Sequence, residues 1–261
     1  MTDVSGHALH SVTVGNGAPA VMIHCMLGRH DMLVPLAKAI GGCVTLFDLP
    51  GHGCSGDWDG KSNYQALVVD VAATCCDGPT HLIGHSFGAT AALRLAVERP
   101  DLVNRLTLIE PVYFAAAKGT AEHAAHAKMF RPFVSAMLAG DEAKAAKLFN
   151  HLWGSTDWDA IPEKLQKYLI DRIYLIVASG AAIEEDAEDI TSAARLALLD
   201  IPVTLIRGGE TQPVIAAIHD VLSSRIPNAT DHEIAKAGHM ISLTHVRAVA
   251  EIIRAAGQET G

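Results

Sequence analysis

Residues 80–98, THLIGHSFGATAALRLAVE, join a short apolar run to an alanine-rich helical pattern across two glycines. The run at 80–84 is typical of a buried strand, and residues 87–98 have apolar positions at helical spacing. Between them, Gly84-His85-Ser86-Phe87-Gly88 has the form G-x-S-x-G, in which a tight strand-to-helix turn exposes a serine hydroxyl. An ordinary glycine-rich turn is the alternative. The strand-to-helix context favours a nucleophile, Ser86, beside a helix N-terminus that stabilises developing negative charge.

Strands and helices alternate along the chain on both sides of this turn. Apolar runs predict further strands at 20–24, 43–47, 102–109, 202–207 and 230–235. Helical spacing predicts helices at 30–40, 62–77 (with Ser62 as the cap candidate), 213–225 and 244–256. Such alternation predicts an α/β fold, a mostly parallel, doubly wound sheet of about eight strands with helices on both faces.

Residues 113–199 interrupt this alternation with alanine-rich helical stretches and no convincing strand. We therefore expect an α/β core domain formed by 1–112 and 200–261, and a helical cap insertion formed by 113–199. The cap should close over the carboxyl ends of the strands, where binding sites of such sheets lie. The candidates for the substrate pocket are His24, His85, Met129, Phe133, Trp153 and Met240.

Three segments, HLIGHSFGA at 81–89, DLPGHGCS at 48–55 and AGHM at 237–240, together resemble the α/β-hydrolase superfamily. The resemblance runs in order over nearly the whole chain, and the cap region matches only in type. It implies a carboxylesterase-like serine hydrolase of class EC 3.1, which cleaves a small to medium, largely apolar ester through an acyl-serine intermediate. It also implies that Asp48, His52 and Ser55 belong to a structural turn and are not catalysts.

The general base should come late in the chain, after the last strand. His239 follows the predicted strand 230–235, and Gly238 gives its loop the freedom to turn the imidazole toward Ser86. His232 and His245 are near in sequence, but we expect them in a strand and in the closing helix. His239 is therefore the predicted base.

The acid that orients this histidine has two candidates. In most relatives it follows the penultimate strand, here 202–207, but Thr211 occupies the place of the usual aspartate and the neighbouring Glu210 could serve instead. The second candidate is Glu110, directly after strand 102–109, where haloalkane dehalogenases carry their acid. A carboxylate directly after a buried strand is costly unless it has a partner, which favours Glu110.

An oxyanion hole would stabilise the negative charge that develops on the substrate. One donor should be the backbone N–H of Phe87, and the other should come from the loop after strand 20–24. Relatives commonly have His-Gly there, whereas this chain has His24-Cys25-Met26. Cys25 or Met26 would therefore supply the second N–H.

The composition disfavours several other functions. The 261 residues carry a net charge of −9 without a Lys/Arg run, which argues against nucleic acid and anionic membrane surfaces as partners. No apolar stretch approaches the ~20 residues of a membrane span, and residues 1–10 do not resemble a secretory signal.

Five cysteines without CxxC pairing suggest the reducing cytoplasm and no metal site. We also expect no cofactor, and we expect His123 and His126 to be solvated.

Several activities could use the same residues. They are those of a lactonase, a thioesterase, a C–C bond hydrolase, an acyltransferase and a cofactor-free perhydrolase. A dehalogenase is disfavoured because its nucleophile is an aspartate. A non-catalytic ligand receptor of the same fold is the alternative from another class. The expected partner is a small-molecule substrate, and a homodimer stays open as the oligomeric state.

Overall fold

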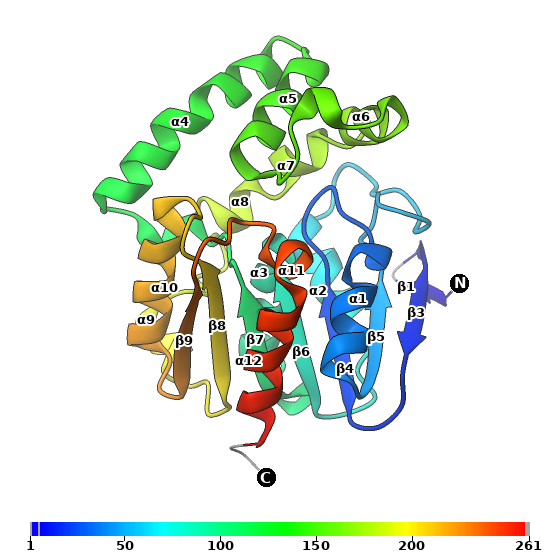
Figure 1. Ribbon diagram of the computed structural model, residues 1–261, viewed down its shortest axis with the longest axis vertical. Helices are drawn as coiled ribbons and strands as arrows, with labels where there is room; N and C mark the ends of the chain where they lie inside the picture. The colour runs from blue at the N-terminus through cyan, green and yellow to red at the C-terminus, as the bar shows by residue number, and fades with distance from the viewer. Residues whose placement is uncertain (1, 5, 259–261) are drawn as a thin grey trace.

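The computed structural model describes residues 2–4 and 6–258 and shows a central sheet with helices on both faces (Figure 1). Seven strands lie in the order β3-β5-β4-β6-β7-β8-β9. β3 is antiparallel to β5, and the other neighbouring pairs are parallel. In chain order these strands are β3 (Ser11–Val14), β4 (Pro19–Ile23), β5 (Cys43–Phe47), β6 (Thr80–His85), β7 (Val103–Ile109), β8 (Val203–Gly208) and β9 (Ala229–Ile234). The α/β fold class predicted from the sequence is confirmed.

The strand count differs slightly from the prediction. The described main sheet has seven strands instead of about eight, because β1 (Thr2–Val4) and β2 (His7–Leu9) pair only with each other. Between β2 and β3, the backbone N–H of His10 donates to Ser55 Oγ and its carbonyl accepts from Asp48 N–H.

Two apolar cores, one on each face, hold the helices against the sheet. Val21 and Ile23 of β4 face one core, and Ala20 and Met22 face the other, as the two-residue period of a strand requires. The helices of the Val21 face are α2 (Tyr64–Thr74), α3 (Phe87–Glu98) and α10 (Pro213–Arg225). Those of the Ala20 face are α1 (His30–Ile40), α11 (Ile241–Thr244) and α12 (Val246–Gln258).

Most helix bounds agree with the sequence patterns, with two differences. Helix α2 begins at Tyr64 and not at Ser62, because the Asn63 side chain accepts from Ala66 N–H and caps it. Ser62 instead accepts from the indole N–H of Trp58. The predicted helix 244–256 corresponds to α12 (Val246–Gln258), and a separate short helix, α11 (Ile241–Thr244), precedes it.

Residues 113–199, called here the helical segment, connect β7 to β8. Every element described in them is helical. The elements are η2 (Phe114–Ala117), α4 (Ala121–Leu138), α5 (Glu142–Trp153), η3 (Trp158–Ala160), α6 (Glu163–Ile170), α7 (Tyr174–Ala178), α8 (Gly180–Ile183) and α9 (Ala193–Leu196). Figure 1 shows α4 to α7 above the carboxyl ends of the strands, whereas α9 lies beside α10. A short turn, η1 (Pro100–Leu102), precedes β7.

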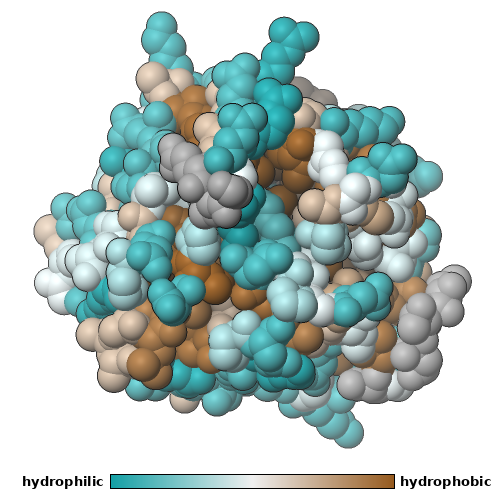
Figure 2. Space-filling model, turned by 90° about the horizontal axis from the view of Figure 1, so that it is seen from below, coloured by the Kyte–Doolittle hydropathy of each residue, from teal (hydrophilic) through white to brown (hydrophobic). Residues whose placement is uncertain are grey.

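The opposite end of the molecule, at the amino ends of the parallel strands, has a mixed surface. Figure 2 shows hydrophilic and apolar residues interspersed on that face. Within residues 2–4 and 6–258, no helix combines the length and the apolar character needed to cross a bilayer.

The turn between β6 and α3 depends on close backbone packing. A Cβ atom on Gly88 would collide with the carbonyl oxygens of Ile23 and His24 at the end of β4. A Cβ on Gly84 would collide with the backbone of Gly88 and Ala89. Both glycines are therefore required by the approach of α3 to the sheet.

We predict that Gly88→Ala lowers the free energy of unfolding by at least about 2 kcal/mol, because backbone atoms must move to admit the methyl group. Urea unfolding followed by circular dichroism measures this. Gly180→Ala is the matched control, since a Cβ there meets no atom within 4 Å, and its midpoint should stay the same or rise. Equal midpoints for both variants would contradict this account of the turn.

Candidate active site

Ser86 lies at the turn between β6 and α3 in a strained backbone conformation. Its φ is 57° and its ψ is −118°, a region that residues other than glycine rarely adopt. Its N–H donates to Ile109 O at the end of β7, at 2.9 Å, and its carbonyl accepts from Ala89 N–H. Such strain persists only where the surroundings enforce it. Here it fixes the serine side chain at the carboxyl ends of the strands.

A continuous chain of hydrogen bonds links three side chains from distant parts of the sequence. His239 Nε2 lies 2.9 Å from Ser86 Oγ, and His239 Nδ1 lies 2.9 Å from Glu110 Oε2. With Glu110 ionised, Nδ1–H donates to the carboxylate and Nε2 is left to accept from the serine hydroxyl. All three side chains are buried.

Glu110 is fully buried and has its hydrogen bonds satisfied by three donors. Gly208 N–H donates to Oε1 at 2.7 Å, and Thr211 Oγ1 donates to Oε2 at 2.5 Å. Burial by itself raises the pKa of Glu110, but the hydrogen bond and charge of His239, with the bonds from Thr211 and Gly208, outweigh it and hold the pKa below its ordinary value. Glu210 is exposed, and its backbone N–H donates to Ala237 O. Of the two acid candidates, the structure brings Glu110 to His239.

Two buried histidines shape the loop that follows β4. His24 Nδ1 donates to Cys25 O at 2.7 Å while Nε2 accepts from Leu49 N–H. His52 Nδ1 donates to Pro50 O while Nε2 accepts from Leu27 N–H at 2.9 Å. Burial lowers the pKa of His24 to about 4 and that of His52 to about 3. Both imidazoles are therefore neutral, as an accepting Nε2 requires, and they tie this loop to the 48–55 turn.

The candidate oxyanion donors lie in this loop and at the start of α3. Leu27 N–H is bound to His52, and Gly28 N–H donates to Cys25 O, so these two N–H groups are already used. Cys25 and Met26 therefore remain as candidates for the donor beside Phe87. Met26 lines both of the cavities that meet at Ser86, whereas Cys25 lines one of them.

His85 supports the loop that carries His239. Its Nε2 donates to the backbone carbonyl of His239 at 2.9 Å, and its Nδ1 lies 3.1 Å from Ser242 Oγ. Burial lowers the pKa of His85 to about 3, so the ring is neutral. The two other late histidines lie elsewhere: His232 is in β9, and His245 ends α11.

Two cavities meet at Ser86. The larger, of about 710 Å³, has walls that are mostly apolar and come from the helical segment. The smaller, of about 350 Å³, also contacts polar side chains, including Arg29, Asn150, Thr156 and Tyr168. Five residues belong to both cavities: Met26, Ser86, Phe149, Trp153 and His239. A substrate could therefore place one part on each side of the serine.

The residues predicted for the pocket fall into two groups. Phe133 and Trp153 line the larger cavity, Trp153 also lines the smaller one, and Met240 lines the smaller one. His24, His85 and Met129 line neither. The two histidines lie beneath the site, where they hold loops. Met129 lies on the outer side of α4, and its side chain is 39% exposed. A different stripe of α4 faces the cavity, formed by His126, Phe130, Phe133 and Met137.

The prediction that His126 is solvated is wrong. Its side chain is only 3% exposed, and its ring stacks on Phe114 with centroids 4.1 Å apart. Its Nε2 has no hydrogen-bond partner and lies 3.9 Å from a carboxylate oxygen of Glu184. The spacing 126, 130, 133, 137 on one helix is the sequence signal that could have placed it in the cavity wall.

The comparisons with known proteins agree with this architecture. A protein-family model described as alpha/beta hydrolase fold matches residues 19–246. The chain belongs to the α/β-hydrolase fold family. It is 26% identical over 251 residues to esterase YbfF of Escherichia coli (strain K12), covering 92% of each chain. It is 29% identical over 248 residues to lipase LipV of Mycobacterium tuberculosis, covering 87% of this chain and 85% of that one. The solved structure of a thermophilic esterase superposes with a TM-score of 0.77 at 21% identity, covering 100% of this chain and 97% of that chain.

The neutral histidines of this hydrolase lead to a prediction about acid stability. Because the folded-state pKa values of His24, His52 and His85 lie below the ordinary 6.5, the unfolded chain binds protons first as the pH falls. The free energy of unfolding should therefore decrease from about pH 6.5 downward. We expect His52→Asn to reduce the loss of stability between pH 7 and pH 5 by about 2 kcal/mol.

Urea unfolding at a series of pH values measures this slope. The control is His151→Gln, because His151 is an exposed histidine of α5 and its replacement leaves the hydrogen bonds of His24, His52 and His85 intact. An unchanged slope in His52→Asn would mean that His52 does not stay neutral in the folded protein.

Proposed function

We propose that this protein is a serine hydrolase that cleaves a small to medium, largely apolar ester through an acyl-serine intermediate. The observation that carries the proposal is the hydrogen-bonded chain Ser86–His239–Glu110, which opens into an apolar cavity. The similarity to an esterase and a lipase over most of the chain supports ester hydrolysis of class EC 3.1.

The proposed reaction follows from the positions of these groups. Ser86 Oγ attacks the substrate carbonyl carbon while His239 Nε2 takes the hydroxyl proton, and Glu110 stabilises the resulting imidazolium. The N–H groups of Phe87 and of Met26 or Cys25 bind the oxyanion. Collapse breaks the ester bond, and His239 gives its proton to the leaving alcohol. Water then releases the acid from Ser86 by the same steps.

The substrate class follows from the larger cavity. Aromatic and aliphatic side chains of the helical segment form most of its wall, so an apolar acyl or alcohol group is the best match for it. Arg29, Asn150 and Thr156 in the smaller cavity suit a more polar part of the same ester. A thioester or a lactone presents the same carbonyl chemistry to Ser86, so thioesterase and lactonase activities are the alternatives.

We place the enzyme in the reducing cytoplasm, with a small molecule as its substrate. All five cysteines are free thiols. Burial raises the pKa of Cys25 to about 12, so that thiol stays protonated and is a poor rival to Ser86 as nucleophile.

Labelling with a fluorophosphonate probe tests the proposed nucleophile. We expect one covalent adduct on Ser86, together with hydrolysis of p-nitrophenyl butyrate, and the loss of both in Ser86→Ala. Ser179→Ala is the matched control, because Ser179 is a buried serine that lines the same cavity and should leave labelling intact. Absence of labelling at every pH between 6 and 9 would favour a non-catalytic ligand receptor.

A pair of glutamine variants tests the acid. Glu110→Gln should lower kcat on the order of 10³-fold or more, because His239 loses the carboxylate that orients it and stabilises its charge. Glu210→Gln should leave kcat unchanged, since Glu210 is exposed. Steady-state ester hydrolysis measures both, with near-UV circular dichroism as the check of folding. The reverse outcome would move the acid to the 208–213 loop.

A further inference from the structure

A second cluster of chemically reactive side chains lies at the start of β3 and the end of β5, outside both cavities. β3 pairs with β5 in antiparallel register, with Ser11 opposite Phe47. The next pair is His10 and Asp48, whose backbones are joined by a hydrogen bond of 3.0 Å. Since residues directly opposite one another in an antiparallel pair project to the same side, the register brings the His10 ring toward the Asp48 carboxylate.

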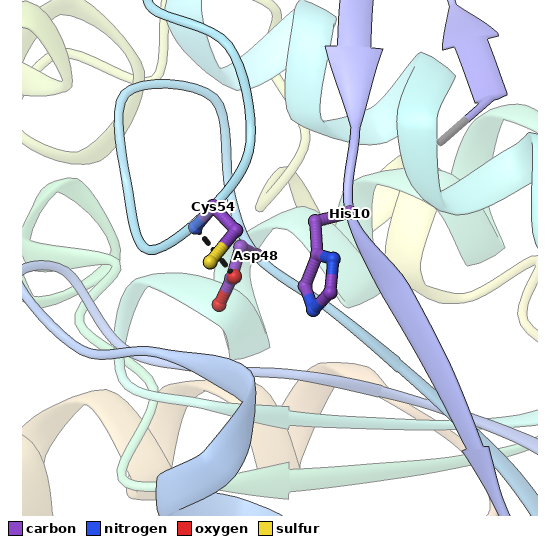
Figure 3. A group of neighbouring side chains, drawn as sticks. All are labelled: His10, Asp48 and Cys54. Carbon is purple, nitrogen blue, oxygen red and sulfur yellow. Dashed lines mark hydrogen bonds between the residues drawn. The ribbon is translucent and has the colours of Figure 1, made fainter.

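The 48–55 turn adds a thiol to this pair. Cys54 N–H donates to Asp48 Oδ2 at 2.9 Å, and Ser55 Oγ donates to Asp48 O at 2.7 Å. Gly53 has a φ of 52°, and a Cβ there would collide with the Asp48 carboxylate, so the turn closes tightly around that side chain. In Figure 3, the carboxylate of Asp48 lies between Cys54 and His10.

The atoms of this cluster form a ligand set suited to a transition metal. One ligand atom each from His10, Asp48 and Cys54 lie within 4.8 Å of one another. Imidazole nitrogen, thiolate sulfur and carboxylate oxygen are the ligands of zinc, at bond lengths of about 2.0–2.3 Å. Tetrahedral ligands at those bond lengths are about 3.3–3.8 Å apart, so the ligand atoms must approach one another by at most about 1.5 Å. The exposed Cys54 side chain has room for that movement.

Asp48 retains one free acceptor position for such an ion. Its Oδ1 accepts from His30 N–H and His30 Nδ1, each at 2.8 Å, and its Oδ2 accepts from Cys54 N–H. A carboxylate oxygen has two lone pairs, so Oδ2 has one left.

We propose that His10, Asp48 and Cys54 form a binding site for a divalent transition metal ion of the zinc class. The Cys54 thiol releases its proton to solvent as the metal–sulfur bond forms, while His10 and Asp48 bind through lone pairs. A water molecule fills the fourth position, on the exposed side of Cys54. The ion joins β3 to the 48–55 turn and takes no part in the proposed ester hydrolysis.

Titration with Co²⁺, a spectroscopic substitute for Zn²⁺, tests this site in the intact protein. We expect one equivalent to give a sulfur-to-cobalt charge-transfer band with the visible bands of a tetrahedral ion, and Zn²⁺ to displace both. Cys54→Ser should abolish the charge-transfer band. His10→Ala should weaken binding on the order of tenfold or more. Asp48 is left unchanged because its hydrogen bonds hold the turn.

Cys43→Ser is the matched control, because Cys43 is a free, partly exposed cysteine at the opposite end of β5. It should bind Co²⁺ as the wild type does. The site is disproved if the wild type shows no charge-transfer band or if the band survives in Cys54→Ser. Unchanged affinity in His10→Ala would mean that His10 is not a ligand and would overturn the proposal. These readouts are optical, so they are independent of any hydrolase activity.

Discussion

Burial of the Glu110 carboxylate is the constraint on which the arrangement of the site depends. A buried charge is tolerated only where donors replace the lost water, and here the donors come from three places: Gly208 at the end of β8, Thr211 in the following loop and His239 after β9. Satisfying the carboxylate therefore fixes the ends of three adjacent strands of the sheet. The same bonds orient the imidazole whose other nitrogen meets Ser86. Stabilisation of the fold and positioning of the proposed base are thus one interaction.

The other buried histidines near the site show what distinguishes His239. His24, His52 and His85 each donate to a backbone carbonyl, and burial keeps all three neutral. They act as connectors between loops, because a neutral imidazole offers one donor and one acceptor in a fixed geometry. His239 instead donates to a carboxylate, which can balance a positive charge on the ring. The partner of the ring, more than its burial, distinguishes the proposed general base from His24, His52 and His85.

Much of this structure was predictable from local patterns, and the rest depended on contacts that those patterns do not encode. The turn at 84–88 and the bounds of α1, α3 and α10 follow from apolar periodicity and glycine positions. Glu110 was favoured by the cost of burying a carboxylate. The cavity wall was harder, because Met129 and His126 are three residues apart on α4 and only the rotation of the helix decides which of them faces inward. The cluster of His10, Asp48 and Cys54 was not foreseen at all, since it depends on the antiparallel register of a strand that the pattern did not reveal.

The positions of Thr211 and Glu110 are physically coupled. Thr211 Oγ1 lies 2.5 Å from Glu110 Oε2, so an aspartate at 211 would bring two carboxylates into near contact in a buried site. Like charges at such a distance cannot both stay ionised, and one of the two acids would have to bind a proton. The hydroxyl of threonine removes that conflict and adds a donor that favours the ionised form of Glu110. Positions 110 and 211 follow the carboxyl ends of the neighbouring strands β7 and β8, so a carboxylate at either position would lie near the His239 imidazole. Only one of two such carboxylates could be ionised. An ionised carboxylate at 110 is therefore compatible with the neutral hydroxyl donor at 211 and not with a second ionised carboxylate there.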